Sequence, residues 1–419
     1  MKKYSQVYEE IKNMIVTKQL VCGDKAPSVR KASELFGVST TTIQNAYFDL
    51  CADGYLIAHP KSGYFVSDID EINTREETVL EKSNIKYDLT GGIADADSFD
   101  FTVWQRYIKS ALRQKERLLS YSEPQGEYDL RCAISGYIRE KRNVIASPDR
   151  IVIGAGVQPL IQALCIILDK KSVVSFPDKS FVQGIGIFND YGFEVHTRDK
   201  DADIIYVSPS HMTRWGDVMP IKRRLELIDY SVKHNSLVIE DDYENEFLYN
   251  VKPTPSLFAL GKGNIVYIGS FSAMLLPGIR ISFMVLTEEL EKKFKEIAPR
   301  YAQTAGKTEQ IALCQYIRDG HINSQTRKIR RLYSAKTKEF AKLLKEEMPD
   351  ALVEIGENTL QIVLRCRFNK DLSVFEEMGI SVFVEKYKDN ELVLVISPSG
   401  ILQNEIKDAV SALKKAIES

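Results

Sequence analysis

The sequence predicts an α/β protein with a mostly parallel sheet covered by helices on both faces, preceded by a small helical domain that ends in a β-hairpin. Two observations support this prediction. From residue 87 onward, short runs rich in β-branched residues alternate with helical patterns, which indicates parallel strands joined by helices. Before residue 67, three helical patterns precede two short strand patterns. A chain of 419 residues, 44% hydrophobic and 27% charged, is long enough for two or three domains.

The region 1–66 has the order helix, helix, turn, helix, hairpin. An apolar stripe over 4–15 predicts the first helix, and Ser28 is a suitable N-cap for a second helix over 29–36. Ser39 is a suitable N-cap for a third helix, and two short strand patterns then flank the basic tip HPKSG. This order is that of a winged helix-turn-helix, whose third helix enters the major groove of DNA while the hairpin contacts the flanking backbone.

The third helix has two different faces. Apolar residues at i, i+3, i+4 and i+7 predict a buried face made of Ile43, Ala46, Tyr47 and Leu50. The opposite face carries short hydrogen-bonding side chains: Thr40, Thr41, Gln44 and Asn45. The region 1–66 has eight Lys and Arg against six Asp and Glu, whereas the whole chain has a net charge of −2. This local basic excess favours DNA binding, and a small docking domain with a solvated polar face is the alternative.

The stretch KAPSVRKASELFGVSTTTIQNAYFDLCADGYLIAHPKSGYFV resembles the DNA-binding domain of the GntR regulator family. The resemblance implies DNA contacts from Arg30, Thr42 and Lys61, and places Thr40 where the family has a basic residue. With the exposed helix face and the hairpin tip, the predicted contacts to a double-stranded DNA operator are Arg30, Thr40, Thr41, Thr42, Gln44, Asn45, Lys61, Ser62 and Gly63.

Residues 67–86 are predicted to form a linker, because they are acidic and contain few large apolar side chains. At full extension about 20 residues reach roughly 65–70 Å, enough to move one domain across another.

No apolar stretch approaches the roughly 20 residues of a membrane helix, and the six cysteines form no CxxC pair. We therefore expect a cytoplasmic protein with reduced thiols, no membrane partner and no metal site.

Polar clusters follow several of the predicted strands. The sequence GAG at 154–156 opens a helix whose free N–H groups suit a phosphate. Asp241 and Tyr243 follow another strand, and Ser270 and Arg280 flank the loop GSFSAMLLPGIR. Each cluster alone is typical of an ordinary turn or surface loop. Ligands of parallel sheets bind beyond the carboxyl ends of the strands, so clusters at successive strand ends together predict one anion-binding site.

The region 87–419 resembles the fold-type I aminotransferases in YSEPQGEYDLRCAISGYIREKRNV, SPSH, VIEDDYENEF, SFSAMLLPGIR and EQIALCQYIRDGHINSQTRKIRRLY. Joined to a GntR-like domain, it resembles the MocR subfamily of regulators. The resemblance implies a large domain over 87–300, a small C-terminal α/β domain over 301–419, and the cofactor pyridoxal 5′-phosphate.

The resemblance also assigns roles around this cofactor. It implies that Asp241 keeps the pyridine nitrogen protonated, that Tyr243 hydrogen-bonds the ring oxygen, and that Phe181 stacks on the ring. The phosphate is expected at the helix that begins near Gly156 and at the loop that ends at Arg280. The full predicted cofactor-binding set is Gly156, Val157, Gln158, Phe181, Asp241, Tyr243, Ser270, Ser272 and Arg280.

Ala273 occupies the position of the family's cofactor-binding lysine, which follows SFS in the motif SFSK. An alanine cannot replace this lysine because the covalent link requires a primary amine. No arginine follows Arg367, so the family's carboxylate-binding arginine near the C-terminus is also absent. We therefore predict a protein that is not an enzyme and binds the cofactor weakly or without a covalent bond. Natural loss of the lysine and an engineered replacement both account for Ala273.

Together these features predict a transcriptional regulator. Its first domain binds DNA, and its aminotransferase-like region forms a homodimer and senses pyridoxal phosphate or a related small-molecule effector. One alternative is an aminotransferase inactivated by loss of its lysine. The other is a regulator whose aminotransferase-like region is a dimerisation scaffold without a ligand.

Overall fold

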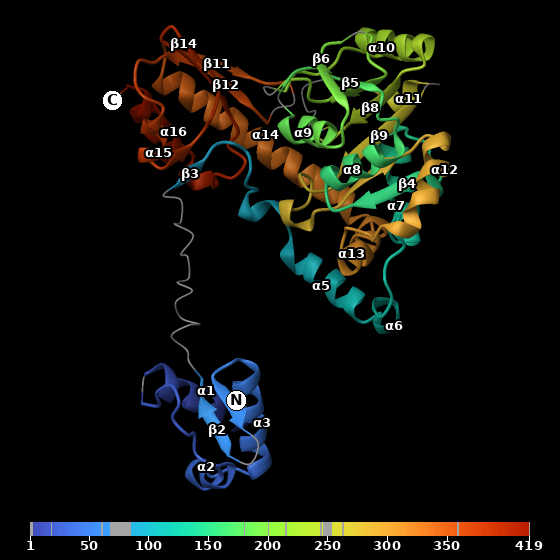
Figure 1. Cartoon of the computed structure of the whole chain (residues 1–419). Helices are drawn as coiled ribbons and strands as arrows, with labels where there is room; N and C mark the ends of the chain where they lie inside the picture. The colour runs from blue at the N-terminus through green and yellow to red at the C-terminus, as the bar shows by residue number, and fades with distance from the viewer. Residues whose placement is uncertain are drawn as a thin grey trace. The chain divides into compact units, whose positions relative to one another are not determined.

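The computed structural model divides the chain into two compact units, which we name the head (Met1–Ser83) and the body (Asn84–Ser419) (Figure 1). Lys61 and most of the predicted linker, residues 68–84, lie outside the described residues. None of the helices in the described ranges is long and apolar enough to cross a membrane. The structure describes residues 3–17, 19–59, 62–67, 85–179, 181–199, 201–213, 216–243, 245, 254–261, 264–357 and 360–418.

The head is a winged helix-turn-helix, as predicted. Ser28 caps α2 by accepting a hydrogen bond from the backbone N of Lys31, and Ser39 caps α3 by accepting one from that of Thr42. Between them, Gly37 adopts the left-handed conformation that closes α2. The predicted buried face of α3 is confirmed, since Ile43, Ala46, Tyr47 and Leu50 are all 0% exposed. The elements are α1 (Lys3–Val16), α2 (Val29–Phe36), α3 (Thr40–Ala52), β1 (Leu56–His59) and β2 (Gly63–Val66).

The body contains a mostly parallel sheet, also as predicted. Its strand order in the described residues is β4-β10-β9-β8-β7-β5-β6, and only β10 runs antiparallel to its neighbours. The strands are β4 (Ile151–Gly154), β5 (Val173–Phe176), β6 (Glu194–Thr197), β7 (Ile204–Val207), β8 (Leu237–Asp241), β9 (Ile265–Ser270) and β10 (Ser282–Val285).

Alternation along the strands separates the two faces of this sheet. On β9, Tyr267 packs in the same core as α5, α7 and α13, whereas Val266 and Ile268 pack in the core of α8, α9 and α12. Both cores are apolar, which explains why the buried strands read as continuous hydrophobic runs. The helices are α5 (Phe101–Leu112), α6 (Lys115–Leu118), α7 (Tyr128–Arg142), α8 (Val157–Ile167), α9 (Val182–Asp190), α10 (Ile221–His234), α11 (Leu257–Leu260), α12 (Glu288–Ile297) and α13 (Lys307–Arg318).

A second, antiparallel sheet of order β11-β12-β15-β14 lies in the C-terminal part of the body. The helix α14 has 27 residues and is about 40 Å long. Its first half packs in the core of the large sheet and its second half in that of the small sheet, so it connects both (Figure 1). The remaining elements are β3 (Tyr87–Asp88), β11 (Leu352–Ile355), β12 (Ile362–Arg367), β13 (Ile380–Ser381), β14 (Phe383–Lys388), β15 (Glu391–Ile396), α14 (His321–Glu347), α15 (Ser373–Glu377) and α16 (Ile406–Glu418).

Strand register places the predicted polar clusters together. Ser282 on β10 pairs with Gly154 of β4 on one side and with Ser270 of β9 on the other. β8 is hydrogen-bonded to β9 in parallel and ends at Asp241. The start of α8, the end of β9 and the end of β8 therefore meet at one edge of the sheet.

Candidate cofactor and DNA sites

A cavity of about 460 Å³ lies at this edge of the large sheet. Six of the nine predicted cofactor-binding residues line it, together with Ala273. The six are Val157, Phe181, Asp241, Tyr243, Ser270 and Ser272. Several further lining residues were not predicted, including Phe176, Asp178, Tyr206, Ser208 and His211.

One end of the cavity has the donors that an anion needs. Gly156 is the N-cap of α8 and has a φ of 93°, which favours glycine. A Cβ at Gly156 would lie 2.3 Å from Nη2 of Arg280, so this guanidinium lies against the start of α8. The first N–H groups of a helix, here including those of Val157 and Gln158, have no partner within the helix and attract negative charge. Gly156, Gln158 and Arg280 are thus placed beside the cavity, although they do not line it.

The loop after β9 adds two hydroxyl groups. Oγ of Ser270 accepts hydrogen bonds from the backbone N of Ser272 (3.3 Å) and from Oγ of Ser282 (2.9 Å). Because Ser270 accepts both bonds, its own proton remains available to donate. Oγ of Ser272 is buried and has no hydrogen-bond partner among the described residues. An orphaned buried hydroxyl in a cavity lining is costly unless a ligand bonds to it.

At the end of β8, Asp241 is 4% exposed and lines the cavity. The phenol of Tyr206 donates a 2.6 Å hydrogen bond to Oδ2 of Asp241. Burial, together with the charge of Asp241, raises the pKa of Tyr206 well above its ordinary value, so the phenol keeps its proton. The ring of Tyr206 stacks on Phe176, with centroids 4.9 Å apart. Sequence reasoning missed Tyr206 because an aromatic residue within a buried strand usually indicates only core packing.

Aromatic rings form another part of the lining. Phe181, at the start of α9, lies 5.3 Å from the ring of Tyr206 between centroids. Gly184 makes room for it, since a Cβ there would lie 2.2 Å from the Phe181 ring. The imidazole of His211 lies 5.4 Å from the ring of Tyr243. The motif SPSH supplied His211 to the resemblance but was not assigned a role.

The residue after Asp241 braces the site from the other face of the sheet. Oδ2 of Asp242 accepts hydrogen bonds from Nε of Arg142 (2.7 Å) and from the phenol of Tyr267 (2.9 Å). Its Oδ1 accepts one from Oγ of Ser210 (2.6 Å). Burial acts against the charge on Arg142, but Asp242, Tyr267 and Glu240 together outweigh it, so the pKa of Arg142 rises above its ordinary value. These bonds fix the end of β8 and so fix the position of Asp241.

The predicted DNA-contacting residues lie on the outer surface of the head. Thr40, Thr41, Gln44 and Asn45 of α3 are exposed, and Thr42 is half-buried. The Arg30 side chain is 91% exposed and meets Glu34 at 3.8 Å, a surface pair that contributes little to stability. At the hairpin tip, Ser62 is exposed and Gly63 is half-buried. Lys61 lies outside the described residues.

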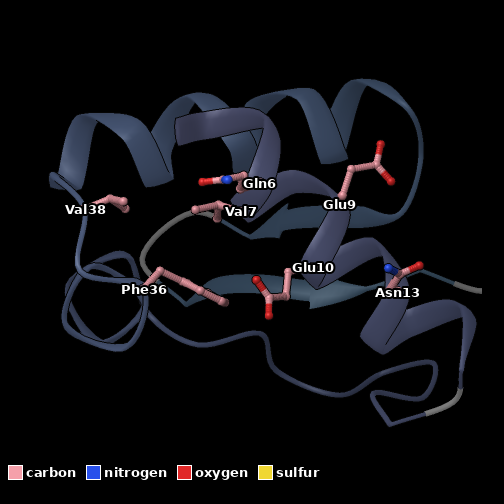
Figure 2. Close-up of a pocket in the computed structure, with 7 residues that line it drawn as sticks. All are labelled: Gln6, Val7, Glu9, Glu10, Asn13, Phe36 and Val38. Atoms are coloured by element: carbon pink, nitrogen blue, oxygen red, sulfur yellow. The ribbon is translucent and has the colours of Figure 1, made fainter. Parts of the chain in front are cut away.

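A different surface of the head carries an acidic hollow of about 500 Å³. Glu9 and Glu10 of α1 line this hollow, together with Phe36 at the end of α2 and Val38 from the turn before α3, and Figure 2 shows Glu10 beside Phe36. Both glutamates are exposed. Two carboxylates repel a phosphate backbone, so the hollow is a poor site for DNA and α3 remains the candidate face.

Family comparisons agree with this architecture. Residues 3–66 match the bacterial regulatory proteins of the gntR family, and residues 86–387 match aminotransferase class I and II. The HTH-type transcriptional regulator YhdI of Bacillus subtilis is 30% identical to the chain, covering 99% of this chain and 95% of its own length. The probable rhizopine catabolism regulatory protein MocR of Rhizobium meliloti is 26% identical, covering 88% of this chain and 82% of its own length.

The fold of the body also matches solved aminotransferases. A crystal structure of Pyrococcus horikoshii kynurenine aminotransferase superposes with a TM-score of 0.68 at 19% identity, covering 84% of this chain and 94% of that chain. At this identity the match shows the fold alone. The chain thus combines a gntR-type head with an aminotransferase-like body, and it matches relatives named as regulators over most of their length. The chain therefore belongs to the MocR subfamily of GntR transcriptional regulators, DNA-binding proteins whose winged helix-turn-helix precedes an aminotransferase-like domain.

Proposed function

We propose that the body of this regulator binds pyridoxal 5′-phosphate without a covalent bond and uses it as an effector. The strongest support is the buried Oγ of Ser272, which has no hydrogen-bond partner among the described residues. Ser272 lines the cavity among other hydrogen-bond donors, and Asp241 lines the same cavity. A cavity of about 460 Å³ is within the usual range of small-molecule sites.

The phosphate would bind at the start of α8. Ser270, Ser272 and the first N–H groups of α8 supply hydrogen bonds, and Arg280 supplies positive charge. Charge-assisted hydrogen bonds are roughly twice as strong as neutral ones. These groups would therefore provide much of the affinity even without a covalent link.

The ring would lie between Phe181 and the end of β8. Asp241 would hold the proton of the pyridine nitrogen, and the hydrogen bond from Tyr206 helps to orient this carboxylate. Tyr243 would hydrogen-bond the ring oxygen. In catalysts the bound cofactor supplies an electron-accepting ring. In this chain the same side chains would serve binding and orientation.

Ala273 is the basis for proposing that the body does not catalyse transamination. Its methyl group lines the cavity but can neither bond to the cofactor nor transfer a proton. Sustained conversion of an amino acid to its keto acid by this chain would contradict this part of the proposal, and would favour an enzyme that uses another base.

We further propose that the body forms a homodimer and that effector binding changes how two heads meet DNA, which is a coupling between distinct sites. Exposed apolar side chains on the body support a protein contact, since Leu119 is 88% and Tyr121 is 100% exposed. A palindromic operator would match two heads related by twofold symmetry.

Isothermal titration of the full chain with pyridoxal phosphate tests the proposal. We expect saturable binding that dialysis reverses and borohydride does not fix. Arg280→Ala should weaken binding about 10- to 150-fold, because it removes a charge-assisted contact. The exposed Arg300 provides the control, and Arg300→Ala should leave the affinity unchanged.

A gain-of-function variant completes this test. Ala273→Lys should create a covalent link to the cofactor that borohydride fixes and mass spectrometry locates. If neither the original chain nor Ala273→Lys binds pyridoxal phosphate, the body is a ligand-free scaffold and the alternative is correct.

A further inference from the structure

The outer face of α3 carries one large aromatic side chain. Phe48 is 73% exposed, the highest exposure of any large apolar side chain in the described part of the head. Counted along α3 from Thr41, Gln44 follows at i+3, Asn45 at i+4 and Phe48 at i+7. This spacing places all four residues on one face of the helix.

This face is opposite to the core. The buried residues Ile43, Ala46, Tyr47 and Leu50 repeat the same spacing two positions later, which is a rotation of about 200° around the helix. Phe48 is therefore directed away from the core, in the direction of the predicted DNA contacts. Helix packing in the head does not explain an aromatic residue at this position.

The neighbours of Phe48 favour DNA over protein as its partner. A protein interface usually gathers apolar residues at its centre, whereas Phe48 shares its face with Thr41, Gln44 and Asn45, all of which are polar. Amides such as Gln44 and Asn45 can read adenine, and apolar side chains can contact the methyl group of thymine. Phe48 lies about 10 Å along α3 from Thr41, which corresponds to about three base pairs.

We propose that Phe48 packs against a thymine 5-methyl group in the major groove and thereby sets a preference for T·A at one position of the operator. The inference rests on DNA binding by α3. It adds a specificity-determining residue beyond the polar contacts that the sequence predicts. The contact is apolar, so it should contribute to sequence discrimination and little to the salt dependence of binding.

The test uses the full-length chain and a randomised duplex library. Sequences selected by the original protein are compared with those selected by Phe48→Ala, and binding to the best duplex is measured by fluorescence anisotropy. Each thymine in that duplex is then replaced in turn by deoxyuridine, which removes only the methyl group. For the original protein we expect one position where this replacement weakens binding about fourfold, the effect of one buried methyl group.

Phe48→Ala should bind the thymine and uracil duplexes equally at that position, with an unchanged salt slope. Leu35→Ala is the matched control, because Leu35 is 65% exposed but lies on α2. It should retain the thymine preference. Both side chains are exposed, so both variants should keep the thermal stability of the head.

Other outcomes are equally informative. Retained thymine preference in Phe48→Ala overturns the inference. Retained preference with a changed oligomeric state in light scattering also overturns it, and assigns Phe48 to a protein contact. If the original protein enriches no duplex sequence, DNA recognition by α3 is wrong as well. If it enriches duplexes without any methyl effect, only the role of Phe48 is wrong.

Discussion

Two glycines of α9 provide a matched test of how the cavity is built. A Cβ on Gly184 would lie 2.2 Å from Cε1 of Phe181, whereas a Cβ on Gly186 would meet nothing within 4 Å. Neither glycine has a positive φ. The substitutions Gly184→Ala and Gly186→Ala therefore make the same chemical change in the same helix. Only the new methyl group at position 184 would meet the Phe181 ring.

The expected magnitudes follow from this contact. Alanine in place of glycine within a helix contributes roughly 0.5–1 kcal/mol, so Gly186→Ala should stabilise the body by about that amount. At Gly184 the ring must retreat by about 1.3 Å to reach a normal carbon–carbon distance. Such overpacking costs about 1–3 kcal/mol, and this is the expected difference in free energy of unfolding between the two variants.

Ligand binding should separate the variants further. If Phe181 stacks on pyridoxal phosphate, displacing its ring should weaken binding about two- to tenfold, the usual effect of an aromatic contact. Gly186→Ala should bind as the original chain does. The measurements are urea denaturation followed by circular dichroism, and isothermal titration with the cofactor. Equal stability and equal affinity of the two variants would refute the packing of Phe181 described above.

Three further predictions concern other parts of the molecule. Tyr206→Phe removes the hydrogen bond to buried Asp241 and should lower the free energy of unfolding by about 1–3 kcal/mol in urea titrations; an unchanged value would contradict this. Burial raises the pKa of Glu240 from 4.5 to about 7, so its stabilising contribution is complete below about pH 4.5 and is lost as the pH rises through 7. The urea midpoint of unfolding should therefore fall between about pH 5 and 8, and it should fall less steeply in Glu240→Gln. A fall that is equally steep in the variant would exclude Glu240 as its cause. Arg30→Ala should weaken DNA binding and reduce the salt slope by about 0.9, measured by anisotropy across salt concentrations; an unchanged slope would remove Arg30 from the phosphate contacts.

Periodicity explains why so much of the fold could be predicted. The spacing of Ile43, Ala46, Tyr47 and Leu50 fits only a helix with one buried face, and the structure buries all four. Continuous apolar runs such as IVYIG indicate strands buried on both sides, and β9 is such a strand. The two family resemblances then identified the order of the domains, which periodicity alone does not specify.

The residues that sequence reasoning missed depend on contacts between strands. Tyr206 pairs with Ile239, two residues before Asp241, and side chains two apart on a strand share a face. The phenol therefore reaches Asp241 only because β7 and β8 pair in this register. Gly184 similarly reads as an ordinary helical glycine until the ring of Phe181 is placed against it. The spacing of residues along one segment contains no information of this kind.

The unfavourable features of the body favour a ligand over the scaffold alternative. Arg280 adopts a left-handed conformation with a φ of 48°, and Ser272 buries a hydroxyl without a partner among the described residues. Strained backbone and unpaired buried groups cost free energy of order 1–3 kcal/mol each. A surface that serves only for dimerisation gains nothing from these two features. Ser272 and Arg280 both lie in the loop after β9, and Arg280 lies against the start of α8, so an anion bound there would offset both costs. A ligand-free scaffold would leave both costs without a compensating contact, so these two features support the proposed phosphate site.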